Sequence, residues 1–358
     1  MGGPPAVSII TPTHNHGEFL AECVGSVLGQ TFASWEQIVI DDGSTDATPE
    51  LMARFRDPRI RYLRQPRRGI ERLAETYNSA LAVCRAPLIA ILEGDDTWPA
   101  NKLEALVPAF ADEGVVLAYG VTEVVGDGKA MFPARIPSPG FESFFLTGTL
   151  ANVPVGSATL AMLDYRGLTF TYPCSVILRR RTLEAIGGFQ HRPGLVVTDY
   201  PTFLRLSIEG RFHFDPRTMG YWRIHQAGTT ANYMDQILAE IHRETLRFRG
   251  EFADHVRLRN NDWRDVDSRW QVALGGIAMR GARRLLLDGR WGDARAGLIR
   301  AMLSAEATTK VAALAGFVGS FVGHSVEWAY RLTGRAWFEQ LEQDTVRLVW
   351  PTRTKGRL

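Results

Sequence analysis

The chain has 358 residues, of which 45% are hydrophobic and 22% are charged, and its formal net charge is +2. This length allows one large domain or two moderate ones with a proper core, and the nearly even charge excludes an electrostatic footprint for nucleic acid over the whole chain. The three cysteines, Cys23, Cys84 and Cys174, lie far apart without C-x-x-C spacing, which favours reduced thiols in a cytoplasmic protein over a disulfide framework or a zinc site.

The first 120 residues alternate between two kinds of periodicity. The start, MGGPPAVSII, lacks a basic region followed by an apolar core, so no signal peptide is expected. Strands are expected at residues 7–11, 36–40, 60–63, 88–92 and 115–119, and helices at residues 17–30, 46–55, 70–84 and from Pro99 onward. This alternation predicts βαβ units, and therefore an α/β fold whose mostly parallel sheet is covered by helices on both faces.

The middle of the chain is less regular. Residues 126–171 are rich in Gly and Pro and are expected to form loops with short strands. Residues 175–189 predict a strand and then a helix whose C-cap is formed by Gly187 and Gly188. Residues 198–210 predict a further, capped helix.

After about Asn232 the chain is expected to be helical throughout. Residues 268–289 and 292–306 predict paired amphipathic helices with Arg-rich polar faces. We therefore expect a first domain at residues 1–230 and a helical C-terminal region at residues 231–358. The C-terminal region is expected to contact the acceptor, a second copy of the chain or a membrane.

Acidic residues directly follow two of the expected strands. They are Asp41 and Asp42 after residues 36–40, and Glu93, Asp95 and Asp96 after residues 88–92. Ligands of parallel sheets bind beyond the carboxyl ends of the strands, and carboxylates this close disfavour each other's ionisation. Mg²⁺ and Mn²⁺ prefer oxygen ligands, and Mg²⁺ often completes its shell with substrate phosphates. The second cluster therefore predicts a divalent-cation site for a diphosphate; a solvated loop in which Asp96 caps the next helix is the alternative.

Three strings of the sequence resemble one known family. They are VSIITPTHN (7–15), QTFASWEQIVIDDGSTD (30–46) and ILEGDDTWPANKLE (91–104), in that order. Together they resemble the family 2 glycosyltransferases, which have the GT-A fold, over about residues 6–230. The resemblance implies an inverting enzyme with a Mg²⁺ or Mn²⁺ cofactor. Such an enzyme moves a sugar from a nucleoside-diphosphate sugar, with a UDP-sugar favoured, to a hydroxyl of a glycan or lipid-linked acceptor in the synthesis of surface polysaccharides or other glycoconjugates.

The resemblance places the nucleotide base at the ends of the first two strands. Pro12 and Thr13 would border the base, and Asp42 would accept a hydrogen bond from the base ring. The alternative for Asp42 is a turn-forming role before Gly43.

Two further nucleotide contacts are implied by the third expected helix. Asn78 matches an asparagine that family members usually carry. The arginine that commonly precedes that asparagine is Tyr77 here, so Arg72 is expected to take its place on the diphosphate. The alternative for Arg72 is a solvated position on the helix surface.

The metal motif of the family is usually Asp-x-Asp, and Glu93 takes its first position here. This departure makes Asp95 the preferred direct metal ligand. Glu93 is then expected to contact the ribose or a metal-bound water, and Asp96 to support the metal site.

The segment YWRIHQAGTT (221–230) resembles a Y-R-x-H segment that closes over the diphosphate in the family. The resemblance implies that Arg223 and His225 bind the diphosphate and that His225 is a candidate metal ligand. A purely structural histidine is the alternative.

In the family, the catalytic base is the Asp of a Glu-Asp pair at the start of a helix, about a hundred residues after the metal motif. Thr198 and Asp199 occupy that place, so Asp199 is the expected base that removes the acceptor proton. The alternative role of Asp199 is the N-cap of the helix at residues 198–210.

Residues 311–326 form a stretch of sixteen residues without a formal charge. The stretch is shorter than the roughly 20 residues that a membrane-spanning helix needs, so a buried helix is expected. The alternative is an interfacial helix at the cytoplasmic face of the inner membrane, aided by nearby arginines. A homodimer contact is also open.

Two other functions compete with sugar transfer. One is a non-catalytic sugar-binding, nucleotide-binding or scaffold protein on the same fold, because Glu93 and Thr198 both depart from the usual residues. The other is a nucleotidyltransferase, which is less favoured because the string TPTHNHGE lacks a glycine-rich loop with a basic residue.

Overall fold

The computed structural model describes residues 3–127, 135–136, 156–164, 171–192, 196–255, 258, 261–304 and 307–322. The chain divides into two compact units. One unit consists of Met1–Met162 and Thr169–Ile237, and the other of Leu163–Leu168 and Leu238–Leu358. The division near residue 237 falls within one helix, α9 (Thr229–Glu251). Most of the predicted loop region 126–171 lies outside the described residues.

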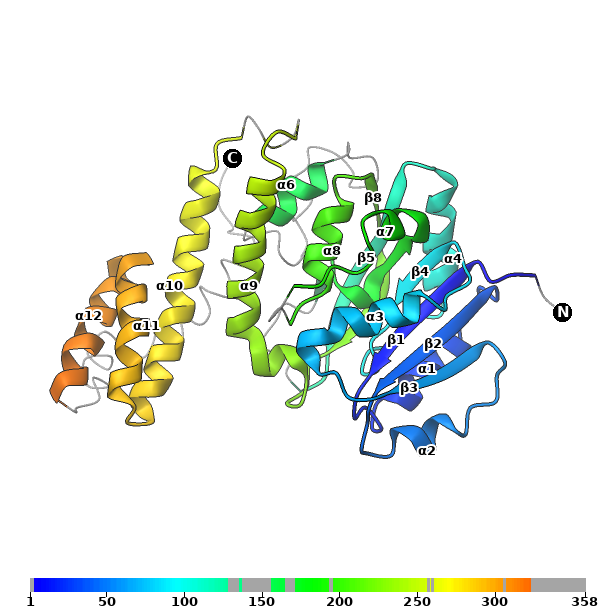
Figure 1. The fold of residues 1–358 in the computed structure, drawn as a ribbon, viewed down its shortest axis with the longest axis horizontal. Coiled ribbons are helices and arrows are strands. Elements are labelled where there is room, and N and C mark those ends of the chain that lie inside the picture. The colour runs from blue at the N-terminus through cyan, green and yellow to red at the C-terminus, as the bar shows by residue number, and fades with distance from the viewer. Residues whose placement is uncertain are drawn as a thin grey trace. The chain divides into compact units, whose positions relative to one another are not determined.

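The first unit is built on an eight-stranded sheet (Figure 1). Its strands are β1 (Val7–Thr13), β2 (Trp35–Asp42), β3 (Ile60–Gln65), β4 (Leu88–Ile91), β5 (Val115–Val125), β6 (Arg135–Ile136), β7 (Val176–Arg179) and β8 (Arg211–Arg223). Their order is β3-β2-β1-β4-β7-β5-β6, with β8 paired to β5. The first four strands in this order are parallel and so are β5 and β8, whereas β7 is antiparallel to both of its neighbours. The predicted α/β fold with a mostly parallel sheet is confirmed.

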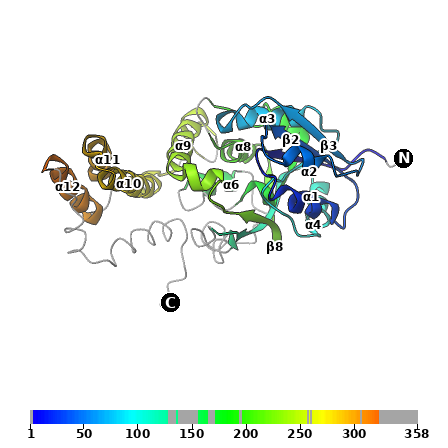
Figure 2. The same ribbon diagram turned by 90° about the horizontal axis from the view of Figure 1, so that it is seen from below.

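Helices cover both faces of this sheet (Figures 1 and 2). Helix α3 (Leu73–Leu81) lies on one face, and α1 (Leu20–Leu28) and α4 (Lys102–Leu106) lie on the other. The other helices before α9 are α2 (Thr48–Met52), α6 (Ser157–Leu163), α7 (Arg180–Ala185) and α8 (Asp199–Leu206). Strands β1, β2 and β4 are buried along their whole length, as expected for strands with helices on both sides.

Two elements differ in length from the sequence prediction. β5 runs to Val125 rather than residue 119, because β8 pairs with it along its length. α4 begins at Lys102 rather than Pro99, because the side chain of Gln30 takes hydrogen bonds that a helix would use itself. Its Nε2 donates to the Pro99 carbonyl at 2.8 Å, and its Oε1 accepts the Leu103 N–H at 3.1 Å.

Helix α7 ends as predicted, at the two glycines. The N–H of Gly188 donates to the Leu183 carbonyl at 2.8 Å, and the N–H of Gly187 donates to the Glu184 carbonyl at 3.0 Å. These two bonds are those of a Schellman C-cap. The predicted glycine C-cap is therefore confirmed.

Glu36 of β2 is a carboxylate that is only 1% exposed. It accepts hydrogen bonds from the Ser8 hydroxyl and from both the N–H and the Nε of Arg85, each at 2.7 Å. Burial opposes its ionisation, but these hydrogen bonds outweigh burial and hold the pKa of Glu36 below its usual value. The carboxylate ties the starts of β1 and β2 to the turn before β4.

Glu36→Gln is expected to lower the free energy of unfolding by about 1–3 kcal/mol at pH 7, because it removes charge-assisted hydrogen bonds from a buried group. The folded pKa lies below the unfolded value of about 4.3, so this contribution is complete above that pH. It is lost as the pH falls through the folded value. Urea unfolding of the wild-type protein and Glu36→Gln between pH 7 and pH 3 measures this contribution, with Glu184→Gln on the surface as control. If the difference in the free energy of unfolding stays constant over this range, the proposed role of the Glu36 carboxylate is contradicted.

The described part of the second unit, up to residue 322, is helical, as expected. Besides the end of α9 it contains α10 (Arg264–Leu287), α11 (Trp291–Ser304) and α12 (Ala307–Val322). Seven residues of these last three helices form a buried core cluster: Met279, Ala282, Leu286, Ala294, Leu298, Ala301 and Ala313. The prediction of paired amphipathic helices at residues 268–289 and 292–306 is confirmed.

Helix α12 has one buried and one exposed apolar face. Ala313 is fully buried, whereas the four residues of the other face are 54–67% exposed: Val311, Leu314, Val318 and Phe321. The prediction of a buried helix at residues 311–326 thus holds for one face only, and residues 323–326 lie outside the described part. None of the helices described here has both the length and the apolar character that crossing a membrane requires.

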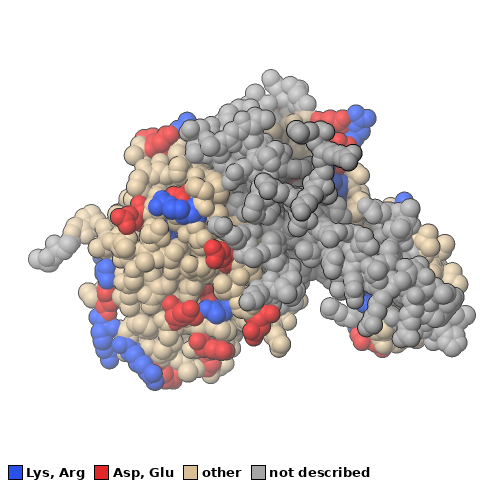
Figure 3. Space-filling view, turned by 180° about the vertical axis from the view of Figure 1, so that it is seen from behind, with Lys and Arg blue, Asp and Glu red and all other residues tan. Residues whose placement is uncertain are grey.

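Surface charge is mixed in sign. On the face shown in Figure 3, the basic and acidic side chains of the described residues are interspersed. Several arginines pair with acidic neighbours one helical turn away, as Arg180 does with Glu184 at 2.7 Å. This distribution agrees with the exclusion of a whole-chain footprint for nucleic acid.

Candidate active site

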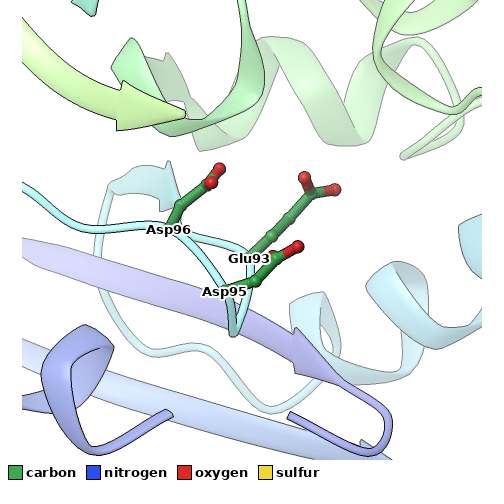
Figure 4. Close-up of side chains that lie close together, drawn as sticks. All are labelled: Glu93, Asp95 and Asp96. Atoms are coloured by element: carbon green, nitrogen blue, oxygen red, sulfur yellow. The ribbon is translucent and has the colours of Figure 1, made fainter. Parts of the chain in front are cut away.

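The acidic loop, residues 93–96, directly follows β4 at the carboxyl edge of the sheet. The side chains of Glu93, Asp95 and Asp96 all project from this short loop (Figure 4). Each of them presents a carboxylate oxygen, and these oxygens lie within 4.8 Å of one another. The predicted cluster is therefore assembled in space as well as in sequence.

Gly94 allows the acidic loop to lie against the end of β1. Its N–H donates to the Pro12 carbonyl at 3.1 Å. A Cβ at this position would lie 2.7 Å from both His16 Nδ1 and Thr13 Oγ1, which is closer than side chains tolerate. Pro12 and Thr13 thus lie beside the acidic loop, and Thr13 is also paired with Asp41 in the register of β1 and β2.

Two of the three carboxylates are held by the end of β8 and the residues just after it. Nε2 of His225 lies 3.1 Å from Oδ2 of Asp95. Asp96 accepts the backbone N–H of Arg223 at 2.8 Å and is also hydrogen-bonded to the thiol of Cys174. The predicted segment 221–230 therefore meets the acidic loop.

The guanidinium of Arg223 is already engaged within the protein. Its Nε donates to the Asp95 carbonyl at 2.9 Å, and its Nη2 contacts the Glu22 carboxylate at 2.6 Å. The ring of His225 lies against Phe19, with 4.7 Å between the ring centroids. The contact of Arg223 with a diphosphate stays a prediction.

The three carboxylates of the acidic loop differ in pKa. Burial, and then the charge of Asp95, raise the pKa of Glu93 to about 8. Burial and the charges of Asp95 and Glu93 raise the pKa of Asp96 well above its usual value. Burial also opposes the ionisation of Asp95, but His16 and His225 outweigh it, so the pKa of Asp95 lies below its usual value. Asp95 is therefore the carboxylate best prepared to ligate a cation.

The acidic loop fits a hard divalent cation. Its donors are carboxylate oxygens, which Mg²⁺ and Mn²⁺ prefer. Two further buried polar atoms lie against the loop, Thr13 Oγ1 and His16 Nδ1, and neither has a hydrogen-bond partner among the residues that the structure describes. A dication would also offset the repulsion among the three carboxylates.

Asp42 ends β2 and closes the loop that follows β3. Its carboxylate accepts the N–H groups of Arg68 at 2.8 Å and Gly69 at 2.9 Å, and the side-chain amide of Gln65 at 2.8 Å. Burial opposes its ionisation, but these bonds outweigh burial and hold the pKa of Asp42 below its usual value. The turn-forming alternative belongs to Asp41 instead, whose Oδ1 accepts the Ser44 N–H at 2.8 Å.

Arg72 and Asn78 both have protein partners. Arg72 forms a two-pronged ion pair with Glu75, at 2.8 Å and 2.5 Å, and its side chain is 56% exposed. Asn78 donates to the Phe189 carbonyl at 2.9 Å and accepts the Phe189 N–H at 2.8 Å. These contacts tie α3 to the chain that follows α7. The nucleotide contacts expected of Arg72 and Asn78 stay predictions.

Asp199 is the first residue of α8, and Thr198 holds the N-cap position without a side-chain capping bond. The N-cap alternative for Asp199 is therefore wrong. Burial raises the pKa of the Asp199 carboxyl. Besides burial and nearer groups, the charge of Asp199 also raises the pKa of Glu93 and of Tyr77, which places Asp199 near the acidic loop.

Three side chains of the site were missed or misjudged from the sequence. Tyr77 donates to Glu93 Oε1 at 2.8 Å, so the residue that stands where the family has an arginine serves the acidic loop. His16, three residues after the predicted Thr13 in the string VSIITPTHNH, was not predicted as a site residue. Cys174 gave no signal, because it comes far later in the chain than the loop it contacts.

The sheet order and the site together define a class of protein. A parallel β3-β2-β1-β4 arrangement, with an acidic loop after β4 and a carboxylate at the end of β2, is the arrangement of the GT-A fold. The model of the family described as Glycosyl transferase family 2 matches residues 8–187, about half of the chain. The chain belongs to this family.

Curated relatives match about a third of the chain. UDP-Glc:alpha-D-GlcNAc-diphosphoundecaprenol beta-1,3-glucosyltransferase WfgD of Escherichia coli is 35% identical over 134 residues, which cover 36% of this chain and 52% of WfgD. Glycosyltransferase GlyG of Streptococcus pneumoniae serotype 4 is 36% identical over 116 residues, which cover 32% of this chain and 38% of GlyG. The matched part thus spans about half, or less, of these relatives.

A solved structure shares the fold over most of the chain. The mannosyltransferase PcManGT from Pyrobaculum calidifontis, in complex with GDP-Man and Mn²⁺, matches with a TM-score of 0.53 and 18% identity. The match covers 98% of this chain and 89% of PcManGT. At this identity the likeness shows the fold.

Proposed function

We propose that this protein is an inverting, metal-assisted glycosyltransferase. It moves a sugar from a nucleoside-diphosphate sugar, with a UDP-sugar favoured, to a hydroxyl of a glycan or lipid-linked acceptor in polysaccharide or glycoconjugate synthesis. The observation that carries this proposal is the acidic loop after β4, with Asp42 at the end of the neighbouring strand β2 and the partly buried Asp199, whose charge acts on Glu93, at the start of α8. The name of WfgD, which states UDP-Glc and a diphosphoundecaprenol-linked sugar, supports these classes of donor and acceptor.

The nucleotide is expected to lie along the ends of β1 and β2. Asp42 keeps unshared electron pairs on its carboxylate beside the bonds to Gln65, Arg68 and Gly69, so it accepts an N–H of the base. Pro12 and Thr13, between Asp42 and the acidic loop, border the base and ribose. Glu93, at the near side of the loop, is the ribose contact.

The diphosphate is expected at the acidic loop. Asp95, supported by Asp96 and His225, would hold Mg²⁺ or Mn²⁺, which supplies positive charge against the charge that develops on the leaving diphosphate. Arg223 and His225 add donors on the same side. Arg72 and Asn78 stay the outer candidates for this contact.

The transfer itself needs one proton acceptor. The Asp199 carboxylate takes the proton of the acceptor hydroxyl, whose oxygen then bonds to the anomeric carbon of the donor. The bond between that carbon and the diphosphate oxygen breaks, and its electron pair leaves with the nucleoside diphosphate. One displacement of this kind inverts the configuration at the anomeric carbon.

Calorimetric titration with UDP, GDP, dTDP and CMP, each in Mn²⁺ and in EDTA, tests the proposal. We expect UDP to bind in Mn²⁺ and to lose most of its affinity in EDTA. Metal-dependent binding of another diphosphate would keep the mechanism and change the donor. No binding of any nucleotide in either condition contradicts the proposal and favours the non-catalytic alternative.

The contact with the inner membrane and the homodimer stay proposals about the second unit. The exposed apolar residues of α12 support either of them, because exposed apolar patches commonly mark interaction surfaces. Flotation with anionic liposomes at low salt tests the proposed membrane contact. If the protein does not float with the liposomes, this proposal is contradicted.

A further inference from the structure

Lys102 of α4 is a fully buried lysine to which the proposed reaction assigns no role. Its Nζ donates to the Cys174 carbonyl at 2.6 Å and lies 3.8 Å from the centre of the Trp98 ring. Burial lowers the pKa of Lys102 well below its usual value, although the nearby Cys174 and Asp96 counteract part of that shift. Burying an ammonium group costs free energy that an apolar side chain of the same length avoids.

Two other residues, Trp98 and Gly220, also lie close to the Cys174 carbonyl that accepts the Lys102 hydrogen bond. Trp98 Nε1 donates to the same Cys174 oxygen at 2.7 Å. Gly220 of β8 also lies against it: a Cβ there would come within 2.7 Å of this oxygen and 2.9 Å of the Cys174 sulfur. Cys174 therefore has little freedom to shift.

Cys174 is the centre of the short 3-10 helix η6 (Pro173–Ser175), which leads into β7. Its thiol is fully buried and hydrogen-bonded to the Asp96 carboxylate. On this side the position of the turn sets the position of one member of the acidic loop.

The other end of the same turn packs against β8. Tyr172 accepts the Ser175 N–H at 3.0 Å through its carbonyl, and its ring is stacked on Trp222 at 4.3 Å between centroids. One turn thus connects the surroundings of Asp96 with β8.

We propose that Lys102 is a positioning residue: together with Trp98 it fixes the Cys174 carbonyl, and through this turn it holds Asp96 in place for the cation. The inference rests on the proposed function for the meaning of the acidic loop. It adds two residues, Lys102 and Trp98, that touch neither the nucleotide nor the acceptor.

The test compares Lys102→Met with the wild-type full-length chain, with Lys310→Met, at an exposed lysine of α12, as the matched control. Titration with Mn²⁺ alone, followed by electron paramagnetic resonance, gives the affinity of the acidic loop. We expect Lys102→Met to weaken it about tenfold or more, in the range that outer-shell residues of metal sites contribute, and Lys310→Met to leave it unchanged. Trp98→Phe, which removes the second donor to the Cys174 carbonyl and shortens the ring that Lys102 contacts, is expected to weaken it in the same direction.

Alkylation of the cysteines by N-ethylmaleimide, resolved by mass spectrometry, reports on the turn without any metal. Lys102→Met is expected to speed labelling of Cys174 at least tenfold while Cys84, which is buried elsewhere, labels at the wild-type rate. Wild-type values of both readouts in Lys102→Met overturn the proposal, and so does equal acceleration at all cysteines, since that reports general loosening. If Lys102→Met does not fold, Trp98→Phe decides by the same two criteria.

The two readouts also separate this inference from the proposed function. If the wild-type chain binds no Mn²⁺, the metal site fails as proposed. Selective labelling of Cys174 in Lys102→Met then still supports the fixed turn, whereas unchanged labelling removes it.

Discussion

Asp199→Asn is expected to lower kcat for sugar transfer by about 10²–10⁴-fold, the usual contribution of a general base, while the Kd for UDP in Mn²⁺ stays within about twofold of the wild-type value. Asparagine has nearly the same shape as aspartate but cannot take the acceptor proton. Asp199 begins α8 as a partly buried side chain, and its desolvation raises its pKa. A base with a raised pKa is closer to the ideal for proton transfer near neutral pH.

The measurement pairs steady-state turnover with nucleotide binding. Asp254→Asn, at an exposed position after α9, serves as the control for loss of a carboxylate. If Asp199→Asn keeps more than about a tenth of the wild-type kcat, Asp199 is not the base. If it loses turnover together with nucleotide binding, its role is in the shape of the site.

Asp95→Asn is expected to weaken Mn²⁺ binding by more than the roughly 10–100-fold that outer-shell residues contribute, and so to remove the metal-dependent part of nucleotide binding. The reason is that His16 and His225 hold the pKa of Asp95 low against burial, whereas burial and the neighbouring carboxylates raise the pKa of Asp96. Asp95 therefore supplies the charge that a dication needs.

Asp96→Asn is the matched comparison, because it changes the adjacent carboxylate in the same loop. We expect it to cost less affinity, since an amide oxygen can still accept the Arg223 N–H that Asp96 accepts at 2.8 Å. Titration of both variants with Mn²⁺, and then with UDP, decides. Equal losses in the two variants, or a larger loss in Asp96→Asn, contradict the assignment of Asp95 as the main ligand.

The first four strands and the acidic clusters at their ends were accessible from the sequence for a physical reason. Buried parallel strands are short, continuous and apolar, and each is followed by a helix of a different periodicity. Asp42 and Asp95 follow such strands directly, so local pattern placed them at one edge of the sheet. The C-terminal helices were equally accessible, because their apolar residues recur with helical spacing.

Contacts between distant parts of the chain were not accessible. The strand at Val176–Arg179 was expected, but its antiparallel place between β4 and β5 was not. Asn78 meets the backbone of Phe189, which lies 111 residues later in the chain. No local pattern encodes such a pair.

The sequence also did not reveal which arginines form ion pairs within the protein. Arg72 pairs with Glu75, and Arg223 with Glu22. Glu75 lies within one helical turn of its partner and was visible in principle. Glu22 lies on α1, 201 residues before Arg223 in the chain. Only folding brings the two side chains together.

Asp42 has a consequence for how donor choice could change, whether in nature or by laboratory selection. The carboxylate proposed to recognise the base is also the one that closes residues 65–69, through bonds to Gln65, Arg68 and Gly69. Its replacement leaves these donors unpaired, at about 1–3 kcal/mol for each one that stays buried. Variants with a new base preference are thus expected to carry compensating changes within residues 65–69. A single substitution of Asp42 is expected to destabilise this loop before it changes the choice of donor.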